Sequence, residues 1–166
     1  MALLVMVGCQ NNTNSSSETS YEVYYRVIEE NTSFKNESDY YTISGEMVEM
    51  DDGTYRYYII IDEPKVTMYD VIILMVEDDI PYETNTKMMP SSGIFEKPVC
   101  MVPNQVNTED GFVKGIVLSG ETNKGVVKIE MVVEWQNSGR TITTRDFISF
   151  NLNVRGIQYT EGQISD

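Results

Sequence analysis

Acidic side chains stand next to one another at three places in the chain, and paired carboxylates are residues that acid–base and metal chemistry often use. The runs are Asp51-Asp52, Glu77-Asp78-Asp79 and Glu109-Asp110. None has the spacing of an EF-hand loop, and each falls at the end of a predicted strand or in a loop. We interpret these runs as solvated turn residues and assign no metal ligand, with a loose calcium site as the alternative.

The chain contains no histidine and only two cysteines. Serine and cysteine nucleophiles with a histidine base, HExxH zinc helices and imidazole general bases are therefore excluded. A structural zinc site would need more ligands of these types, and "SGETNKG" lacks the spacing of a phosphate-binding loop. A glycosidase-type carboxylate pair stays open, but we predict a protein that is not an enzyme and needs no cofactor.

Residues 77–111 form the candidate binding segment, because this stretch is long and lacks strong periodicity. Methionine and aromatic side chains provide adaptable contact surfaces, although they also plug the open end of a sandwich, which is the interpretation that we favour. The segment is expected to be either a functional loop or to contain one or two weak strands, with residues 86–89 and 98–102 as the candidates. The side chains in question are Tyr82, Met88, Met89, Phe95 and Met101.

Tyrosine is unusually frequent, with 11 in the chain, and this suggests a second kind of surface. An exposed row of tyrosines stacks on sugar rings, which would make the protein a carbohydrate-binding module. The simpler interpretation is that tyrosine suits half-buried positions in strands. The candidates for an aromatic surface are Tyr40, Tyr41, Tyr55, Tyr57 and Tyr58.

The beginning of the chain reads "LLVMVGCQ", an apolar run that ends in Gly8-Cys9. Too few residues precede Cys9 to span a bilayer as a helix. Met6-Val7-Gly8-Cys9 resembles the end of a bacterial lipoprotein signal, in which the cysteine is lipid-modified after cleavage. The resemblance implies that residues 1–8 are the remnant of a signal peptide and that Cys9 anchors the protein outside the cytoplasm. It does not extend to the folded domain.

Almost only polar residues follow Cys9, and residues 9–20 are therefore expected to be a flexible, lipid-anchored tether. A frayed N-terminus with an incidental Cys9 is the alternative. Cys100 lies between Pro98 and Pro103 among apolar neighbours, and we interpret it as a buried, inert side chain. A disulfide between Cys9 and Cys100 can form only if Cys9 is not lipid-modified.

Strand patterns dominate the first half of the remaining chain. Residues 21–28 alternate Tyr and Val with polar residues, which predicts a strand. Asp52-Gly53 predicts a tight hairpin between residues 40–50 and 55–62 that sets Met47 opposite Tyr58. Residues 66–76 become apolar on both faces, as expected for a central strand.

The last third predicts two further hairpins with their apolar residues on one face. Residues 112–119 and 126–136 would pair with Leu118 opposite Val127, and the turn in "NSGR" would set Trp135 opposite Ile142. The same register places Asp146 beside Met131, close to Lys114, which is a misfit for an inward-facing position.

No window shows a 3.6-residue apolar stripe, so we predict an all-β protein: an antiparallel β-sandwich, immunoglobulin-like in the broad sense, with a small β-barrel as the alternative. One domain is expected over residues 21–155, with a C-terminal tail over 156–166. The formal net charge of -14 argues against nucleic acid and leaves the lipid anchor as the only membrane contact. We expect a non-catalytic role at the cell envelope, with a protein partner favoured over a glycan.

Overall fold

The computed structural model describes residues 13–159, which form nine strands, one α-helix and two 3₁₀ turns. The helix α1 covers Thr13–Glu30, and the turns η1 and η2 cover Tyr82–Thr84 and Thr108–Asp110. The strands are β1 Thr42–Glu49, β2 Tyr55–Asp62, β3 Met68–Glu77, β4 Ser91–Ser92, β5 Val99–Met101, β6 Gly115–Thr122, β7 Val126–Gln136, β8 Thr143–Asn153 and β9 Gly156–Gln158.

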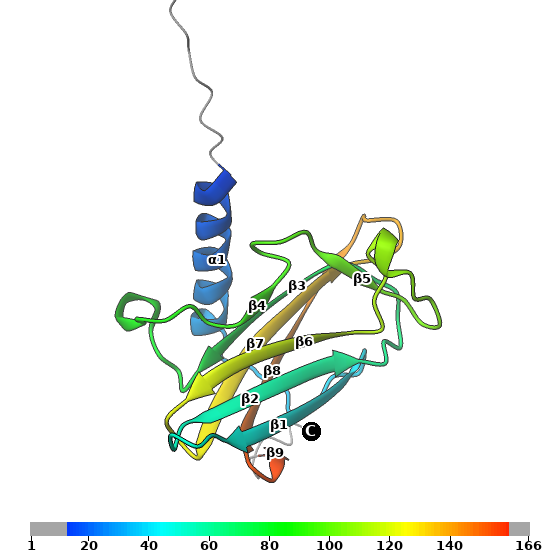
Figure 1. The fold of residues 1–166 in the computed structure, drawn as a ribbon. Helices are drawn as coiled ribbons and strands as arrows, with labels where there is room; N and C mark the ends of the chain where they lie inside the picture. Colours follow the sequence, from blue (N-terminus) through cyan, green and yellow to red (C-terminus); the bar gives the residue numbers. More distant parts are fainter. Residues whose placement is uncertain (1–12, 160–166) are drawn as a thin grey trace, which may run out of the picture.

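Two antiparallel sheets pack face to face (Figure 1). The smaller sheet has the strand order β1-β2-β6, and the larger one has the order β4-β3-β7-β8-β9, with β5 also paired to β3. This arrangement confirms the predicted antiparallel sandwich. Within residues 13–159 the two sheets stay separate and do not close into the alternative barrel.

Helix α1 adds a third layer to the sandwich by packing on the outer face of β3 and β7. The core between the sheets contains Ile73 and Met75, whereas Leu74 and Val76, which alternate with them along β3, belong to the core under the helix. The apolar character of both faces of β3 is thereby explained, and its prediction as a central strand is confirmed.

The prediction of a strand over residues 21–28 is wrong, because these residues belong to α1. The helix buries Tyr21, Tyr24, Tyr25 and Ile28, whose spacing is that of one helical face, and leaves Val23 exposed. The 3.6-residue stripe is thus present in residues that also alternate as a strand would, and packing against β3 and β7 favours the helix.

The helix begins at Thr13, so residues 13–20 of the expected flexible tether are helical. Cys9 and the rest of that tether lie outside the described residues, as do residues 160–166 of the predicted tail. Residues 156–158 of that tail are instead strand β9, paired with β8. Among residues 13–159, no helix combines the length and the apolar character that crossing a bilayer requires.

The β1–β2 hairpin is confirmed, but its register differs by one residue and sets Met47 opposite Tyr57. The Met50 N–H donates to the Thr54 carbonyl at 2.8 Å, so the loop holds three residues instead of two. Only Gly53 among them has a positive φ, 79°, as a three-residue loop requires.

The β7–β8 hairpin is also confirmed, with a shift of two residues that sets Trp135 opposite Thr144. The Asn137 N–H donates to the Ile142 carbonyl at 3.0 Å across a longer loop than predicted. A shift of two keeps every side chain on its predicted face. Asp146 now lies opposite Val133 and is buried.

The pairing predicted between residues 112–119 and 126–136 is wrong. Strand β6 pairs with β2 in the smaller sheet, where Leu118 lies opposite Ile59. Leu118 and Val127 still share one core, but they reach it from opposite sheets. The alternation therefore predicts the inward face and not the neighbouring strand.

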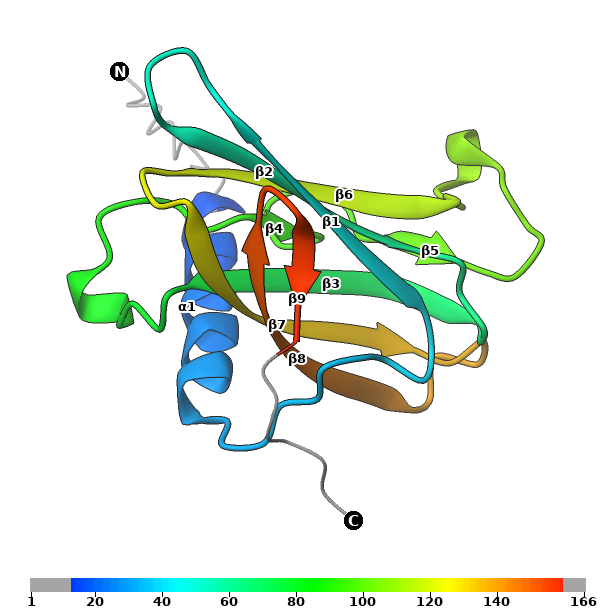
Figure 2. The ribbon, with the colours of Figure 1, turned by 90° about the horizontal axis from the view of Figure 1, so that it is seen from below.

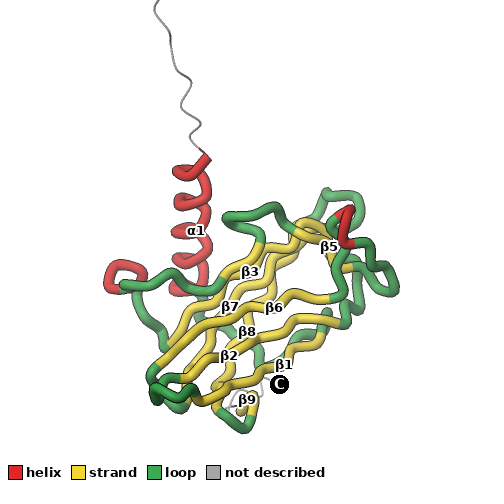
Figure 3. The backbone as a smooth tube through the Cα atoms, in the orientation of Figure 1, coloured by secondary structure: helices red, strands yellow, loops and turns green. Residues whose placement is uncertain are grey.

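The long segment between β3 and β6 runs mostly as loop (Figure 3). The weak strand expected over residues 98–102 is confirmed as β5. The one expected over residues 86–89 is wrong, because the pairing occurs later, at β4. Cys100 is a free thiol and buried, as predicted.

Candidate binding cleft

The sandwich is closed along one side and open along the other. On the closed side β1 packs against β8 and β9, as Figure 2 shows, and Gly45 lies against Leu152 and Ile157. On the open side the edge of β6 faces residues 87–96, with a cavity of about 500 Å³ between them that we call the edge cleft. It is lined by Glu77, Lys87, Met88, Met89, Pro90, Ser91, Phe95, Glu96, Ser119, Gly120 and Glu121.

An ion pair between the buried Glu77 and the exposed Lys87 forms the floor of the edge cleft. Glu77, at the end of β3, has 2% of its surface exposed. Its carboxylate accepts hydrogen bonds from the Tyr57 hydroxyl and from the Lys87 ammonium group, each at 2.5 Å. A buried carboxylate is tolerated when both oxygens are bonded in this way.

The Tyr57 ring also determines which residue stands opposite it on β6. Tyr57 is paired with Gly120, and a Cβ at Gly120 would collide with the Tyr57 ring and hydroxyl. Burial, together with the nearby charge of Glu77, raises the pKa of Tyr57. The geometry therefore keeps this hydroxyl protonated and donating to Glu77.

The interpretation of the acidic run 77–79 as solvated turn residues is wrong for Glu77, which is buried at the end of β3, whereas Asp78 and Asp79 do lie in a turn. Asp78 and Asp79, which follow it, form ion pairs with Lys124 and Lys128 at 2.7 and 2.8 Å. Within residues 13–159, no cluster of three or more cysteine or carboxylate side chains could hold a metal ion.

The wall of the edge cleft opposite β6 presents two large apolar side chains to solvent. Met88 is 66% exposed and Phe95 is 44% exposed. The segment itself is fixed from behind, because the Met89 N–H donates to the Tyr21 hydroxyl and the Phe95 ring lies 5.7 Å from the Tyr21 ring. Helix α1 therefore supports a wall whose outer side chains remain uncovered.

The structure divides the five side chains predicted in this segment. Met88 and Phe95 line the edge cleft, and Met89 lines it while buried against the helix. Met101 is buried between the sheets, and the Tyr82 ring packs 5.4 Å from that of Tyr25 on α1. Three of the five thus fill the fold, and two are available for contact.

The five candidate tyrosines do not form one exposed row. Tyr41 and Tyr57 are buried, and Tyr40 and Tyr55 pack against the core between the sheets. Tyr58 lies on the outer face of the smaller sheet, opposite Ser119 of β6.

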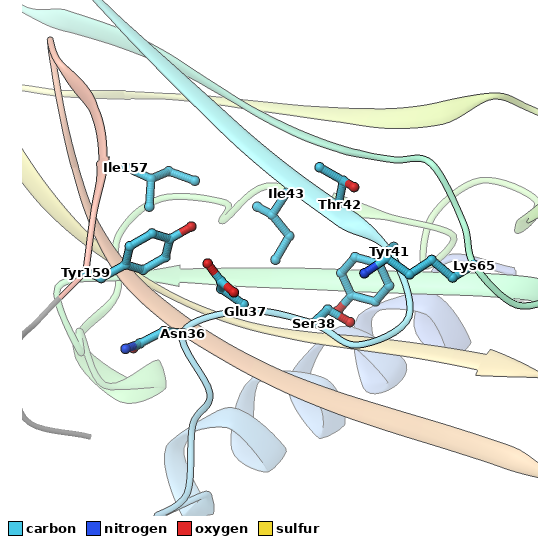
Figure 4. Close-up of a pocket in the computed structure, with 9 residues that line it drawn as sticks. All are labelled: Asn36, Glu37, Ser38, Tyr41, Thr42, Ile43, Lys65, Ile157 and Tyr159. Carbon is cyan, nitrogen blue, oxygen red and sulfur yellow. The ribbon is translucent and has the colours of Figure 1, made fainter. Parts of the chain in front are cut away.

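A second cavity, of about 300 Å³, lies at the beginning of β1 (Figure 4). Beside it the Ser38 hydroxyl donates to the buried Asp146 at 2.6 Å, and Lys35 lies 3.7 Å from the same carboxylate. These polar partners explain how Asp146 can occupy an inward-facing position. The cavity is lined by Asn36, Glu37, Ser38, Tyr41, Thr42, Ile43, Lys65, Ile157 and Tyr159.

The Tyr41 hydroxyl is buried behind this cavity without a hydrogen bond inside the described part of the chain. Burial, with the nearby charge of Asp146, raises its pKa. The Thr42 hydroxyl at this cavity donates to Glu63 at 3.1 Å. We therefore place the candidate site at the edge cleft, where large apolar side chains are uncovered.

Sequence reasoning missed the groups that shape the edge cleft from elsewhere in the chain. Lys87, Glu96 and Gly120 carry no recognisable binding motif. The available signal was a charged residue, Glu77, directly after the apolar run of residues 71–76.

Comparisons with protein-family models, with curated proteins and with solved structures found no match for this chain. The fold and the site define an antiparallel β-sandwich with a helix over one face and a cleft at its open edge. Function follows from the site itself rather than from the fold.

Proposed function

We propose that this chain is a lipid-anchored, non-catalytic binding protein of a bacterial cell envelope, and that it holds a protein partner at the edge cleft. The observation that carries the proposal is the pair Met88 and Phe95, exposed on a wall that the core and helix α1 hold in place. Apolar side chains presented by a fixed surface are the usual anchors of protein interfaces.

A protein partner fits this surface better than a glycan does. Sugar binding would need several exposed aromatic rings in one plane, but four of the five candidate tyrosines pack into the core between the sheets or against it. Methionine provides adaptable apolar contact, which suits a protein surface.

The N-terminal sequence supports the anchor, because Met6-Val7-Gly8-Cys9 resembles a lipoprotein signal and α1 begins four residues after Cys9. At 1.5 Å per residue, the turns between Thr13 and Tyr21 add roughly 12 Å of helix between the anchor and the sandwich. The domain would then be held off the membrane by a helix instead of a flexible tether.

The anchor is tested with full-length protein expressed in bacteria that are fed a labelled fatty acid. We expect the wild-type chain to incorporate label and to partition into detergent, and the Cys9→Ser variant to do neither. A Cys9→Ser variant that still partitions with membranes would rule out lipidation at this residue.

The binding role is tested by capture from detergent-solubilised envelope on the immobilised full-length chain. We expect one partner protein to be retained, and to be lost at least about tenfold when Met88→Ser and Phe95→Ser are combined. The matched control combines Ile142→Ser and Val154→Ser, which are equally exposed but do not line the cleft. Equal capture by both double variants, or elution of glycan alone, would contradict the proposal.

A further inference from the structure

The backbone ladder shows which groups of β6 are free. Because the Met50 N–H bonds the Thr54 carbonyl, these two residues form a hydrogen-bonded pair, and such pairs alternate along an antiparallel ladder. Even-numbered residues of β2, such as Arg56, therefore bond to β1. The backbone groups of Tyr57 and Ile59 bond to β6 instead.

The partners of Tyr57 and Ile59 are Gly120 and Leu118, so the backbone groups of Val117, Ser119 and Glu121 point away from β2. An independent contact agrees, because Lys87 donates to the Glu121 carbonyl at 2.8 Å from that side. Inside the described part of the chain no hydrogen bond reaches the N–H or carbonyl of Val117 or Ser119. These groups recur every second residue, as an added strand requires.

The edge is guarded at only one end. A lysine placed over an edge strand is a common protection against unwanted pairing, and Lys87 covers the Glu121 end in this way. No lysine of the described residues covers Val117, which is 61% exposed, or Ser119, which is also exposed, although β4 comes close to part of β6.

The charges beside this edge indicate which kind of segment fits. The cleft lining contains three carboxylates, Glu77, Glu96 and Glu121. Lys87 pairs with the first and Arg56 with the last, so of the three only Glu96 has no ion pair within residues 13–159. The whole chain carries a formal net charge of -14. Basic segments are therefore attracted to the cleft, and acidic segments or a second copy of this chain are repelled.

We infer that the free edge of β6 takes an extended, basic segment of the partner protein as an added strand. This inference rests on the proposed function and names its binding mode. Main-chain bonds to Val117 and Ser119 hold the segment, its apolar side chains contact Met88 and Phe95, and its basic side chains lie beside Glu96.

The binding mode is tested with a labelled short peptide in which Lys and Val alternate, titrated into the full-length chain. We expect it to bind, and we expect a Glu–Val peptide of the same length not to bind. A Lys–Val peptide that is N-methylated at alternate residues should bind at least about tenfold more weakly, because it cannot complete the ladder. Equal binding of methylated and unmodified peptides would overturn strand addition.

The chain itself offers a matched pair of variants at Ser119. Ser119→Pro removes an N–H that points away from β2, a position where edge strands tolerate proline, and should weaken peptide binding at least about tenfold. Ser119→Ala keeps the N–H and should bind within about twofold. Thermal unfolding checks that Ser119→Pro is folded. If this variant does not fold, the methylated peptide tests strand addition on the wild-type protein.

Failure of this inference is distinguishable from failure of the proposed function. If the partner captured from the envelope is lost with the Met88→Ser, Phe95→Ser variant but retained by Ser119→Pro, strand addition is wrong and the binding role stands. If both variants retain it, the cleft is not the binding face and both proposals fail. Self-association that Ser119→Pro abolishes would assign the edge to a second copy and also overturn the inference.

Discussion

Tyr57 links the two sheets through one hydroxyl, which reaches from β2 to Glu77 at the end of β3. Replacement by Phe keeps the ring over Gly120 but leaves the buried Glu77 carboxylate with Lys87 alone. Losing one hydrogen bond to a buried charged group costs about 1–3 kcal/mol of unfolding free energy. We expect that loss for Tyr57→Phe in urea unfolding near neutral pH, and an unchanged midpoint would show that water replaces the hydroxyl.

The same residue predicts how stability depends on alkaline pH. Burial raises the pKa of Tyr57 in the folded state, so the unfolded chain releases this proton at lower pH, near its ordinary value of about 10. The stabilisation is complete below about pH 10 and decreases as the pH rises above it. Burial also raises the pKa of Tyr24, Tyr25 and Tyr41.

We therefore expect the free energy of unfolding to fall between about pH 9 and pH 11, and to fall less steeply in Tyr57→Phe than in the wild-type chain. Urea unfolding at each pH, with the ultraviolet absorbance of tyrosinate followed in parallel, measures both effects. Equal slopes for the two proteins would mean that Tyr57 titrates with an ordinary pKa.

Gly120 provides a prediction about close packing between neighbouring strands. A methyl group at this position would meet the Tyr57 ring, which is fully buried and held by its bond to Glu77. Overpacking of this kind costs about 1–3 kcal/mol. We expect Gly120→Ala to lower the unfolding free energy by that amount, whereas Gly125→Ala, with ordinary contacts to Tyr55, should cost less than about 1 kcal/mol.

At the scale of elements, α1 is held to the sandwich by one face. Ile28 is buried in the core shared with Leu74 and Val132, whereas Val23 on the opposite side is 50% exposed. Truncating a buried Ile to Ala costs about 2–5 kcal/mol, and surface changes cost about 0.5 kcal/mol or less. We expect Ile28→Ala to lower the unfolding free energy by the larger amount and Val23→Ala by the smaller, measured by urea unfolding.

A strand over residues 21–28 would reverse this order. In such a strand Val23 would share the apolar face with Tyr21, Tyr25 and Val27, and Ile28 would lie on the other face. A larger loss for Val23→Ala than for Ile28→Ala would therefore contradict the helix. The comparison separates two structures that the sequence pattern fits almost equally well.

The strands that were predicted best are those whose pattern of apolar residues fits only one arrangement of buried and exposed faces. Residues of β3 are apolar on both faces, and alternation in β7 and β8 gave the correct inward side. The hairpin registers were wrong because they depend on loop length. Gly53 at a φ of 79° and Arg140 at 52° set those lengths, and local alternation does not report them.

Long-range pairing was the harder problem. Inward-facing residues on β6 and β7 have the same pattern whether the strands are neighbours or lie across the core, so Leu118 was paired with the wrong sheet. Only part of the candidate site was predicted, because contacts between residues far apart in the sequence do not show in local patterns. Met88 and Phe95 stand out within a segment without periodicity, whereas Tyr57 meets Glu77 only through the fold.

At the scale of the whole molecule, charge imbalance limits stability. The chain has 26 acidic and 12 basic side chains, and most of the ion pairs are at least partly exposed. An exposed ion pair contributes about 0–1 kcal/mol and is weakened by salt, whereas the repulsion among excess carboxylates destabilises the compact state and is relieved by salt.

Repulsion dominates here because 26 acidic side chains face 12 basic ones, so even complete pairing would leave more than half of the carboxylates without a basic partner. We expect the unfolding temperature to rise as NaCl increases from about 0.02 M to about 0.5 M, where the screening length falls to roughly 4 Å. NaCl is chosen because sulfate would strengthen apolar burial and obscure the effect. A falling unfolding temperature would mean that the partly buried pairs, such as Lys87 with Glu77, outweigh the repulsion. The same titration should weaken the Lys–Val peptide, so that salt stabilises the sandwich while it releases the basic segment from its edge.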